Sequence, residues 1–421
     1  MADRGTAVAI TGMGAVSPLG AGRDRFWHAL CAGESGIAPL AGTNGVPRLA
    51  ARIVDFSPRD VIRTAHLRRM DALSRSIVAA SRLALADARL DDGAVPAERA
   101  GIVVGSAVGN LSESVQYLER LFAKGPALAS PMMFPNLVLN APASYAAMEI
   151  GYMGATLTVS AGEVSGEQAV VMGCELIRAG RADIVVAGGG DELNDAVLAA
   201  YRRWRALSSQ RGGPEWCSPY DVDRNGVVLG EGAGMLVLES PAHAWRRGAT
   251  VYAEIEDFVS FGVAAPTYDW PRHAPRAAER LRQFLGRWPS PADGVGVDLV
   301  CGSANSSRRL DACELEVLGR LFGEAASGVM LTSIKGAVGE FGAAGALTAV
   351  AACLALHHGA VPPLCSLRSA PPDAPFRFAA RTATARPLGR ALVFSMARGG
   401  ATVALLLRRP AGPDASNPAV R

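Results

Sequence analysis

The amino-acid sequence predicts an α/β protein in which layers of sheet and helix alternate. The main observation is a strand–helix–strand pattern that recurs along the chain. A glycine-rich corner precedes the helix in each half, as is typical of tight strand-to-helix turns. The chain has 421 residues, of which 49% are hydrophobic, so it is long enough to form a large buried core.

The first half of the chain contains the pattern twice. Residues 7–20 read AVAITGMGAVSPLG, a β-branched strand followed by a turn rich in glycine and proline. Residues 70–90 have the apolar spacing of a helix, and residues 100–109 return to a strand that ends in glycine. Residues 156–193 then repeat strand, helix and strand around a glycine-rich corner.

The second half repeats this order. Residues 329–363 again predict strand, glycine-rich corner and helix, and the last two strands are expected at 391–397 and 401–409. We therefore expect two related halves, which divide the chain into residues 1–250 and residues 251–409. Residues 410–421 are rich in proline, alanine and asparagine, and we expect them to form a disordered tail.

The composition argues against several classes of function. Charged residues make up 19% of the chain and the net charge is only +3, so we expect neither a nucleic-acid partner nor a membrane partner. No apolar segment reaches the roughly 18 residues that a membrane span needs. The first residues also lack the features of a signal peptide, which favours a cytoplasmic protein.

The sequence predicts no metal and no organic cofactor. Its seven cysteines are scattered without a C-x-x-C pair, and its six histidines form no ligand cluster. The glycine-rich runs GMGAVSPLG and GGGDELN lack the full spacing of a dinucleotide-binding motif.

Residues 158–169, TVSAGEVSGEQA, have the outline of a turn that presents a nucleophile. An apolar strand-like run leads into small residues, one reactive position and a glycine that opens a helix. The reactive position carries the carboxylate of Glu163. The stretch therefore raises the question of whether this carboxylate is catalytic or has replaced a catalytic group.

A longer block identifies the resemblance. Residues 219–239 read PYDVDRNGVVLGEGAGMLVLE and resemble a signature of the β-ketoacyl synthase family. Three further blocks match the family in the same order: AITGMGAVSPLG at 9–20, RADIVVAGGGDE at 181–192 and IKGAVGEFGAAG at 334–345. The resemblance implies the thiolase fold, in which duplicated βαβαβ halves form five layers (αβαβα) and two chains pair through edge strands.

The resemblance also shows which catalytic groups are missing. An active family member uses a cysteine thiolate at a helix N-terminus to accept the acyl chain, and two histidines to hold the malonyl thioester and stabilise the enolate. The matching positions carry Glu163 in SAGEVSG, Ser303 in CGSAN and Glu340 in KGAVGE. We therefore expect no catalytic residue at these three degenerate positions and no independent condensing activity.

Three other positions complete the comparison with the family. The phenylalanine of the family's G-F-G-G gate is replaced by Arg398, in ARGG. Asp311 and Lys335 keep their family spacing and are interpreted as scaffold that orients the site loops. An ion pair between Glu163 and Arg398 would plug the pocket and exclude substrate.

The family includes proteins of this kind. The chain looks like a chain length factor, the non-catalytic β subunit of the ketosynthase in type II polyketide synthases, which act in antibiotic biosynthesis. This role implies a heterodimer with a catalytic ketosynthase subunit and an acyl carrier protein that brings the tethered polyketide chain. The subunit would shape the acyl tunnel and limit chain length. The usual mark is a glutamine in place of the nucleophile, and placing Gln168 there would require a five-residue slip in an otherwise ungapped block.

Tunnel and interface candidates follow from position within the family. Residues 105–122 match the helix that lines the acyl pocket, and its small residues Val108 and Ser112 would leave room for a longer chain. Residues 130–140 match a segment at the subunit interface, where one of Met132, Met133 and Phe134 would reach across the dimer axis. Ordinary packing of these apolar side chains in a core or interface explains them equally well.

The alternative is an enzyme of another class. Glu163 and Glu340 replace groups that converge in the family's pocket, and Arg398 joins them at the gate. Two carboxylates and a guanidinium could support acid–base chemistry on an acyl thioester, as in an isomerase or dehydratase. A third reading is a scaffold in some other acyl-carrier assembly.

Basic clusters offer docking sites for an acidic carrier protein. The candidates are Arg202, Arg203 and Arg205 in one cluster, and Arg63, Arg68 and Arg69 in another. A solvated surface explains such clusters more simply.

Overall fold

The computed structural model describes residues 7–40, 48–62, 64–90, 95–210, 212–266, 269–270, 274–288, 296–379 and 382–410. Of the tail expected to be disordered, only Pro410 belongs to these ranges. Arg63 also lies outside the described residues.

The described strands form a twelve-stranded sheet in which two halves repeat one topology. The N-terminal half has the order β6–β5–β7–β8–β1, and the C-terminal half has the order β11–β10–β15–β16–β9. In each half the second strand along the chain pairs in parallel with the third and fourth, while the fifth strand pairs antiparallel with the fourth and first. This repetition confirms the expected βαβαβ duplication, while the division at residue 250 stays a prediction.

The strands of the first half are β1 Val8–Ser17, β5 Ala100–Gly105, β6 Thr156–Val159, β7 Ile184–Asp191 and β8 Gly232–Glu239. Those of the second half are β9 Ala253–Gly262, β10 Leu299–Cys301, β11 Met330–Thr332, β15 Arg390–Met396 and β16 Ala401–Arg408. Short strands complete the sheet, β2 Gly20–Ala21 beside β1 and β13 Arg377–Phe378 beside β11. The halves meet where β1 pairs with β9. Two further hairpin-like pairs are β3 Ile37–Leu40 with β4 Arg48–Ala51, and β12 Ala360–Val361 with β14 Thr384–Ala385.

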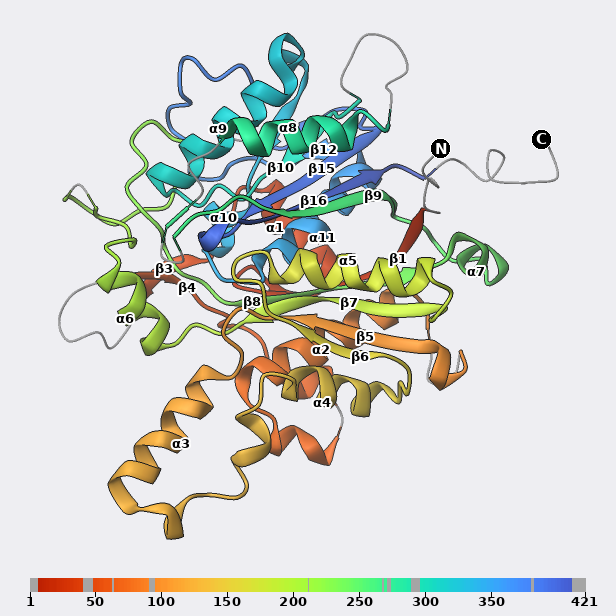
Figure 1. Cartoon of the computed structure of the whole chain (residues 1–421), viewed down its shortest axis with the longest axis vertical. Helices are drawn as coiled ribbons and strands as arrows, with labels where there is room; N and C mark the ends of the chain where they lie inside the picture. The colour runs from red at the N-terminus through yellow and green to blue at the C-terminus, as the bar shows by residue number, and fades with distance from the viewer. Residues whose placement is uncertain are drawn as a thin grey trace.

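Helices form the other layers (Figure 1). The middle layer contains α5 Ser165–Arg178 and α11 Ala344–His358, with α1 Arg23–Cys31 beside α11. The outer layers are α2 Ala72–Asp87 and α4 Ala141–Ile150 on the first half, and α8 Ala274–Leu285 and α9 Arg308–Phe322 on the second. The remaining helices are α3 Leu111–Lys124, α6 Asp195–Arg203, α7 Pro241–Arg246 and α10 Lys335–Val338.

Burial explains the sequence of the central helix. Every residue of α11 from Ala344 to Leu356 is buried, because both sheet halves and α5 cover it. The two helices of this layer approach closely at Gly166 of α5, where an added Cβ would lie 2.7 Å from the carbonyl oxygen of Ala343. Glycine at this position therefore sets how near α5 can pack to the loop before α11. The result is the five-layer αβαβα arrangement expected from the sequence.

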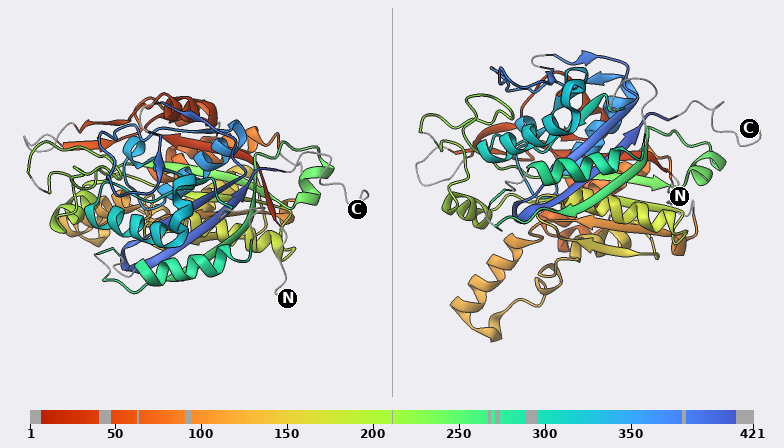
Figure 2. Two further views of the ribbon diagram at one scale, coloured as in Figure 1. Left: turned by 90° about the horizontal axis from the view of Figure 1, so that it is seen from above. Right: turned by 45° about the horizontal axis from the view of Figure 1, so that its top comes forward.

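The segment after β5 differs from the expected helix. β5 ends at Gly105 and α3 begins only at Leu111, so residues 106–110 form a loop and Val108 does not lie on a helix face with Ser112. The helix itself has no buried residue and projects from the body of the molecule (Figures 1 and 2). The expectation that residues 105–122 form one helix is therefore wrong, because the loop is needed to turn the chain out of the sheet. Among the described residues, no helix is both long and apolar enough to cross a membrane.

Candidate functional site

A cavity of about 220 Å³ lies where the loops after β5, β7 and β15 meet the starts of α5 and α11. Glu163, Glu340 and Arg398 all line it, so three positions far apart in the sequence come together. Tyr201 and Trp204, from α6 and the residue after it, line the same cavity. Ser303 is not among the lining residues.

Glu163 is held in the turn between β6 and α5. Gly162 has a φ of +61°, a left-handed conformation that glycine adopts without strain, and it turns the chain before the helix. The hydroxyl of Ser165 accepts a hydrogen bond from the Ala161 N–H at 2.9 Å and donates to the Gly162 carbonyl at 2.6 Å. The nucleophile-type turn is thus fully formed, and it carries a carboxylate into the cavity.

Arg398 pairs with this carboxylate. Its Nη1 lies 2.5 Å from Oε1 of Glu163, and its backbone N–H donates to Oε2 at 3.0 Å. The side chains of Arg398 and Glu163 are only 4% and 10% exposed, so the ion pair is nearly excluded from water. Tyr201 joins it, accepting from Nη1 of Arg398 at 2.7 Å and donating to Oε1 of Glu163 at 3.3 Å. Both carboxylate oxygens therefore have donors from within the chain.

Three aromatic rings surround the guanidinium. The carbon at its centre lies 4.3 Å from the ring centroid of Trp270, 4.4 Å from Tyr201 and 5.5 Å from Trp204. Such contacts stabilise a cation through the negative faces of the rings. Nε and Nη2 of Arg398 have no hydrogen-bond partner within the described structure, so the rings and Glu163 are what compensates its charge.

The surroundings of Arg398 and Tyr201 shift the pKa of both side chains. Burial opposes the charge of the guanidinium, but its interactions with Tyr201 and Glu163 outweigh burial and raise the pKa of Arg398. Burial, with the nearby charge of Glu163, raises the pKa of Tyr201 well above its ordinary value. The tyrosine is therefore a neutral hydroxyl at physiological pH, and the arginine is a cation.

Glu340 also has a charged partner. Lys335, on α10, places its Nζ 2.9 Å and 3.1 Å from the two carboxylate oxygens, and the side-chain amide of Asn305 donates to Oε2 at 2.5 Å. Burial opposes the charge of Lys335, but Glu340 raises the lysine pKa above its ordinary value. Glu340 is therefore a compensated carboxylate, not a bare anion facing the cavity.

Ser303 and Asp311 hold the loop behind the cavity. The Ser303 hydroxyl donates to Oε2 of Glu314 at 2.7 Å. Asp311 accepts from the N–H groups of Tyr220 and Asn305 at 2.9 and 3.0 Å, and so fixes the backbone beside the Asn305–Glu340 contact. Burial raises the pKa of Asp311 to about 7. This geometry is compatible with the expected scaffold role of Asp311, which stays a prediction.

The tunnel candidates separate into two places. Val108 lines the cavity, and its N–H donates to Asp191, which also accepts from Ser106 and Ala343. Burial raises the pKa of Asp191 to about 6. Ser112 lies at the start of α3, where its N–H donates to Glu192, and it does not line the cavity. The tunnel roles of both residues stay predictions.

Met132, Met133 and Phe134 lie on the outer surface beyond α3. Met132 is 65% exposed and Phe134 is 60% exposed, while Met133 is half-buried with its sulfur 3.3 Å from Arg120. Met132 and Phe134 belong to a larger set of exposed side chains, which we call the outer apolar face: Leu118, Phe122, Leu128, Met132, Phe134, Val138, Leu139, Met148, Met153 and Leu157. Exposed apolar side chains mark an interaction surface where they gather into a large patch.

Sequence reasoning missed the residues that complete the ion pair. Tyr201, Trp204 and Trp270 come from segments outside the matched blocks, and the sequence analysis considered only the arginines of this stretch, YRRWRAL at 201–207. It also missed Glu167 in the first turn of α5, which is fully buried. Burial raises the pKa of Glu167, against the opposing effects of Ser395 and Lys335.

The described residues contain no group of three or more histidine, cysteine, aspartate or glutamate side chains placed to hold a metal ion. Gln168, the glutamine that a slipped alignment would put at the nucleophile position, instead accepts from the hydroxyl of Ser260 on β9 at 2.8 Å. It does not line the cavity.

Comparisons with known proteins agree with this fold. The family model of the β-ketoacyl synthase N-terminal domain matches residues 6–244, and that of the C-terminal domain matches residues 252–368. The granaticin polyketide putative β-ketoacyl synthase 1 of Streptomyces violaceoruber is 34% identical, over 96% of this chain and 98% of its own length.

Two solved structures are similar over nearly the whole chain. The ishigamide ketosynthase/chain length factor has a TM-score of 0.87 and 28% identity, covering 97% of this chain and all of the matched one. A type II polyketide synthase acyl carrier protein in complex with its ketosynthase, bound to a hexaketide, gives 0.85 and 25% identity, with coverage of 96% and 100%. These likenesses confirm the expected thiolase-like ketosynthase fold.

Proposed function

The chain belongs to the β-ketoacyl synthase family, and on that premise we propose that it is a non-catalytic subunit of a type II polyketide synthase. In this proposal it pairs with a catalytic ketosynthase and shapes the tunnel that receives the growing acyl chain. Its own contribution is to limit polyketide length, as a chain length factor does.

The buried pair between Glu163 and Arg398 is the observation that carries the proposal. It fills the two positions where the family has its nucleophile and its phenylalanine gate. A carboxylate could be acylated only to a mixed anhydride, which water would hydrolyse before a carbanion attacked it. The backbone N–H of Arg398, which could otherwise stabilise an oxyanion, donates to Glu163 instead. The groups at these two positions are therefore bound to each other and not free for substrate.

The acid–base alternative receives less support from the geometry. A general acid or base must gain and lose a proton near the working pH, and must have an oxygen free to reach substrate. Both oxygens of Glu163 and both oxygens of Glu340 accept hydrogen bonds, and each carboxylate faces a cation. Neither carboxylate therefore has an oxygen free to reach substrate.

The outer apolar face supports a role in association. Its side chains come from α3, from residues 126–140, from α4 and the residues after it, and from Leu157 on β6. Within the described residues β6 is the edge strand of the sheet and pairs only with β5, so its other edge is free to pair with a second chain. We assign the catalytic ketosynthase as the occupant, because a solved structure similar to this chain is a ketosynthase/chain length factor.

An acyl carrier protein is the second partner in this proposal, since a similar structure is a ketosynthase in complex with its carrier. Arg202, Arg203 and Arg205 are exposed near the mouth of the cavity beside Trp204 and remain the candidates for its docking. Arg68 and Arg69 are exposed too.

The test is co-expression with the ketosynthase encoded beside this gene, followed by size-exclusion chromatography and product analysis. We would compare the wild type with Glu163→Gln, Phe134→Ala and Trp245→Ala. Trp245, 71% exposed on α7, is a matched aromatic on a different part of the surface. We expect a 1:1 complex that still condenses with Glu163→Gln, and a change of product length or loss of complex only with Phe134→Ala.

Two results would contradict the proposal. A stable homodimer that turns over an acyl thioester, with activity abolished by Glu163→Gln, would make the carboxylates catalytic. Equal effects of Phe134→Ala and Trp245→Ala would show that the outer apolar face has no special role in pairing.

A further inference from the structure

We propose that the concavity between η1 (Pro58–Asp60), η2 (Ala65–Arg69) and α2 binds the phosphate groups of a small organic molecule. The concavity has a volume of about 750 Å³ and is separate from the cavity that contains Glu163. The inference does not depend on the proposed function, and Arg68 is the one residue of this lining that is also named there as a basic docking candidate.

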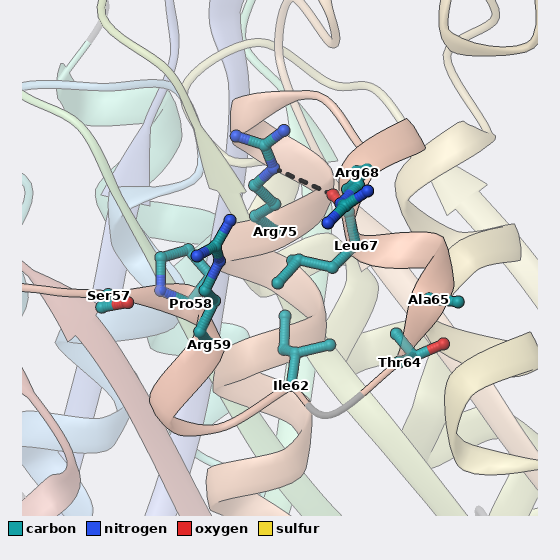
Figure 3. A pocket seen from close by; sticks show the side chains of 9 residues that line it. All are labelled: Ser57, Pro58, Arg59, Ile62, Thr64, Ala65, Leu67, Arg68 and Arg75. Atoms are coloured by element: carbon teal, nitrogen blue, oxygen red, sulfur yellow. Dashed lines mark hydrogen bonds between the residues drawn. The ribbon is translucent and has the colours of Figure 1, made fainter.

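Three arginines from three elements converge on this concavity (Figure 3). Arg59 comes from η1, Arg68 from η2 and Arg75 from the first turn of α2. The Nε of Arg75 donates to the Leu67 carbonyl at 3.3 Å. This bond anchors the Arg75 side chain and does not use its two terminal nitrogens. One guanidinium is thus preorganised by the backbone, and the other two stand near it.

No acidic residue belongs to the lining. It consists of Ser57, Pro58, Arg59, Ile62, Thr64, Ala65, Leu67, Arg68 and Arg75. Within the described part of the chain, Arg59 and Arg68 form no ion pair. The carboxylate that feels the charge of Arg75, Glu113, lies on α3 outside the lining. Three like charges around one hollow repel one another, and an anion in the hollow would relieve that repulsion.

The shape of the donors favours phosphate. A guanidinium presents a planar fork of N–H groups that matches two phosphate oxygens, and several forks can share one dianion. The hydroxyls of Ser57 and Thr64 add donors at the rim. The Thr64 hydroxyl oxygen accepts from the His66 N–H at 3.2 Å, so its hydrogen is free to point to a ligand.

The size and the apolar part of the lining favour an organic body on the ligand. Pro58, Ile62 and Leu67 form this apolar part, and Ile62 is buried. Small-molecule sites have volumes of roughly 300–1,000 Å³, and this concavity falls within that range. A bare phosphate ion would leave most of it empty. The structure therefore favours a molecule with one or two phosphates and a ring or chain that covers the apolar side.

The concavity adjoins the outer apolar face. The carbonyl of Arg69, at the end of η2, accepts from the side-chain amide of Asn136 at 2.8 Å and from the hydroxyl of Tyr145 at 3.3 Å. A protein that covers the outer apolar face would lie close to these arginines, so an acidic segment of such a protein is the competing occupant. The experiment must separate it from a phosphate ligand.

The test is isothermal titration calorimetry with two probes, inorganic pyrophosphate and adenosine diphosphate. The variants are Arg59→Ala/Arg68→Ala and the matched control Arg276→Ala/Arg280→Ala, which removes two exposed arginines from α8. We expect the wild type and the control to bind both probes with a Kd below about 1 mM, and the first double variant to bind at least about tenfold more weakly. Adenosine diphosphate should bind more tightly than pyrophosphate, because its ring covers the apolar lining.

Three results would overturn the inference. The first is no binding of either probe by the wild type at millimolar concentration. The second is an equal loss in both double variants, which would reflect net charge alone. The third is that only the carrier protein, in its apo form without a phosphate-bearing arm, binds in a manner that depends on Arg59 and Arg68. That outcome would assign the surface to an acidic protein.

Discussion

The side chains of the cavity and those of the outer apolar face differ in burial and in pairing. In the cavity, two carboxylates are buried and each is matched by a cation and by hydrogen-bond donors. On the outer apolar face, large side chains such as Phe122 and Met132 are mostly exposed to solvent. The carboxylates of the cavity are thus paired within the chain, whereas the apolar side chains of the outer face are exposed.

This contrast bears on which part of the chain carries out its function. A catalytic pocket keeps groups free for substrate, and it tunes their pKa toward the working pH. Here the groups at the family's catalytic positions contact one another, and the apolar surface is the part that remains to be satisfied. In the proposed function, the molecule keeps the architecture of a condensing enzyme and uses it for association.

Removing one charge of the buried pair should have the largest effect. Glu163→Ala leaves Arg398 buried without its partner, so we expect the free energy of unfolding to fall by about 3–5 kcal/mol. Urea denaturation of the isolated chain measures this loss. The matched control is Glu316→Ala, which breaks an exposed pair with Arg320 and should cost less than about 1 kcal/mol.

The double variant Glu163→Ala/Arg398→Phe sharpens this test. It removes both charges and returns the family's gate residue, so it should be more stable than Glu163→Ala alone. Additive losses in the double variant would show that the two side chains are not coupled.

The pH dependence of stability should expose the buried carboxyl of Asp311. Its pKa is raised from 3.8 to about 7, so between these values the folded state keeps a proton that the unfolded state has lost. Stability therefore decreases as pH rises from about 4 to about 7, by up to about 4 kcal/mol. Asp311→Asn should make this part of the curve less steep, leaving the part due to other buried carboxyls such as Asp191, whereas the exposed Asp373→Asn should leave it unchanged. Parallel curves for all three proteins would contradict the assignment.

A substitution on the outer apolar face should affect pairing and spare the fold. Phe122→Ala removes a ring that is 82% exposed on α3, so the isolated chain should keep its stability. We expect binding to the ketosynthase to weaken about 10- to 30-fold, since buried aromatic side chains dominate interface energies. Titration of the partner by calorimetry gives the value, and an unchanged affinity would exclude α3 from the interface.

The smallest expected effect is that of Tyr201→Phe. It keeps the ring against Arg398 but removes the hydroxyl that bridges the arginine and Glu163. We expect a loss of about 1 kcal/mol in unfolding free energy, the usual contribution of one hydrogen bond. A loss as large as that of Glu163→Ala would show that the hydroxyl, and not the ion pair, holds the cluster.

The fold was largely predictable because its strands and helices have strong local patterns. β-branched runs and glycine corners located the main strands, and the matched blocks placed Glu163, Glu340 and Arg398 at fixed spacing. The loop at residues 106–110 was not predictable from apolar spacing. It depends on hydrogen bonds from its backbone to Asp191, a residue about 80 positions away in the sequence.

The charge pairing inside the cavity was only partly predictable. The Glu163–Arg398 pair could be proposed, because both residues replace neighbours in the family pocket. Its completion by Trp270 depends on a loop outside any matched block. The pairing of Glu340 with Lys335 was missed, since a retained lysine was interpreted as scaffold alone.

Intact-protein mass spectrometry of the co-expressed complex, after incubation with an acyl-loaded carrier protein, tests the central claim most directly. The account predicts an acyl adduct on the catalytic ketosynthase and no mass change on this chain, with the same result for Glu163→Gln. An acyl adduct on this chain that disappears in Glu163→Gln would show that the carboxylate is a nucleophile and would contradict the account.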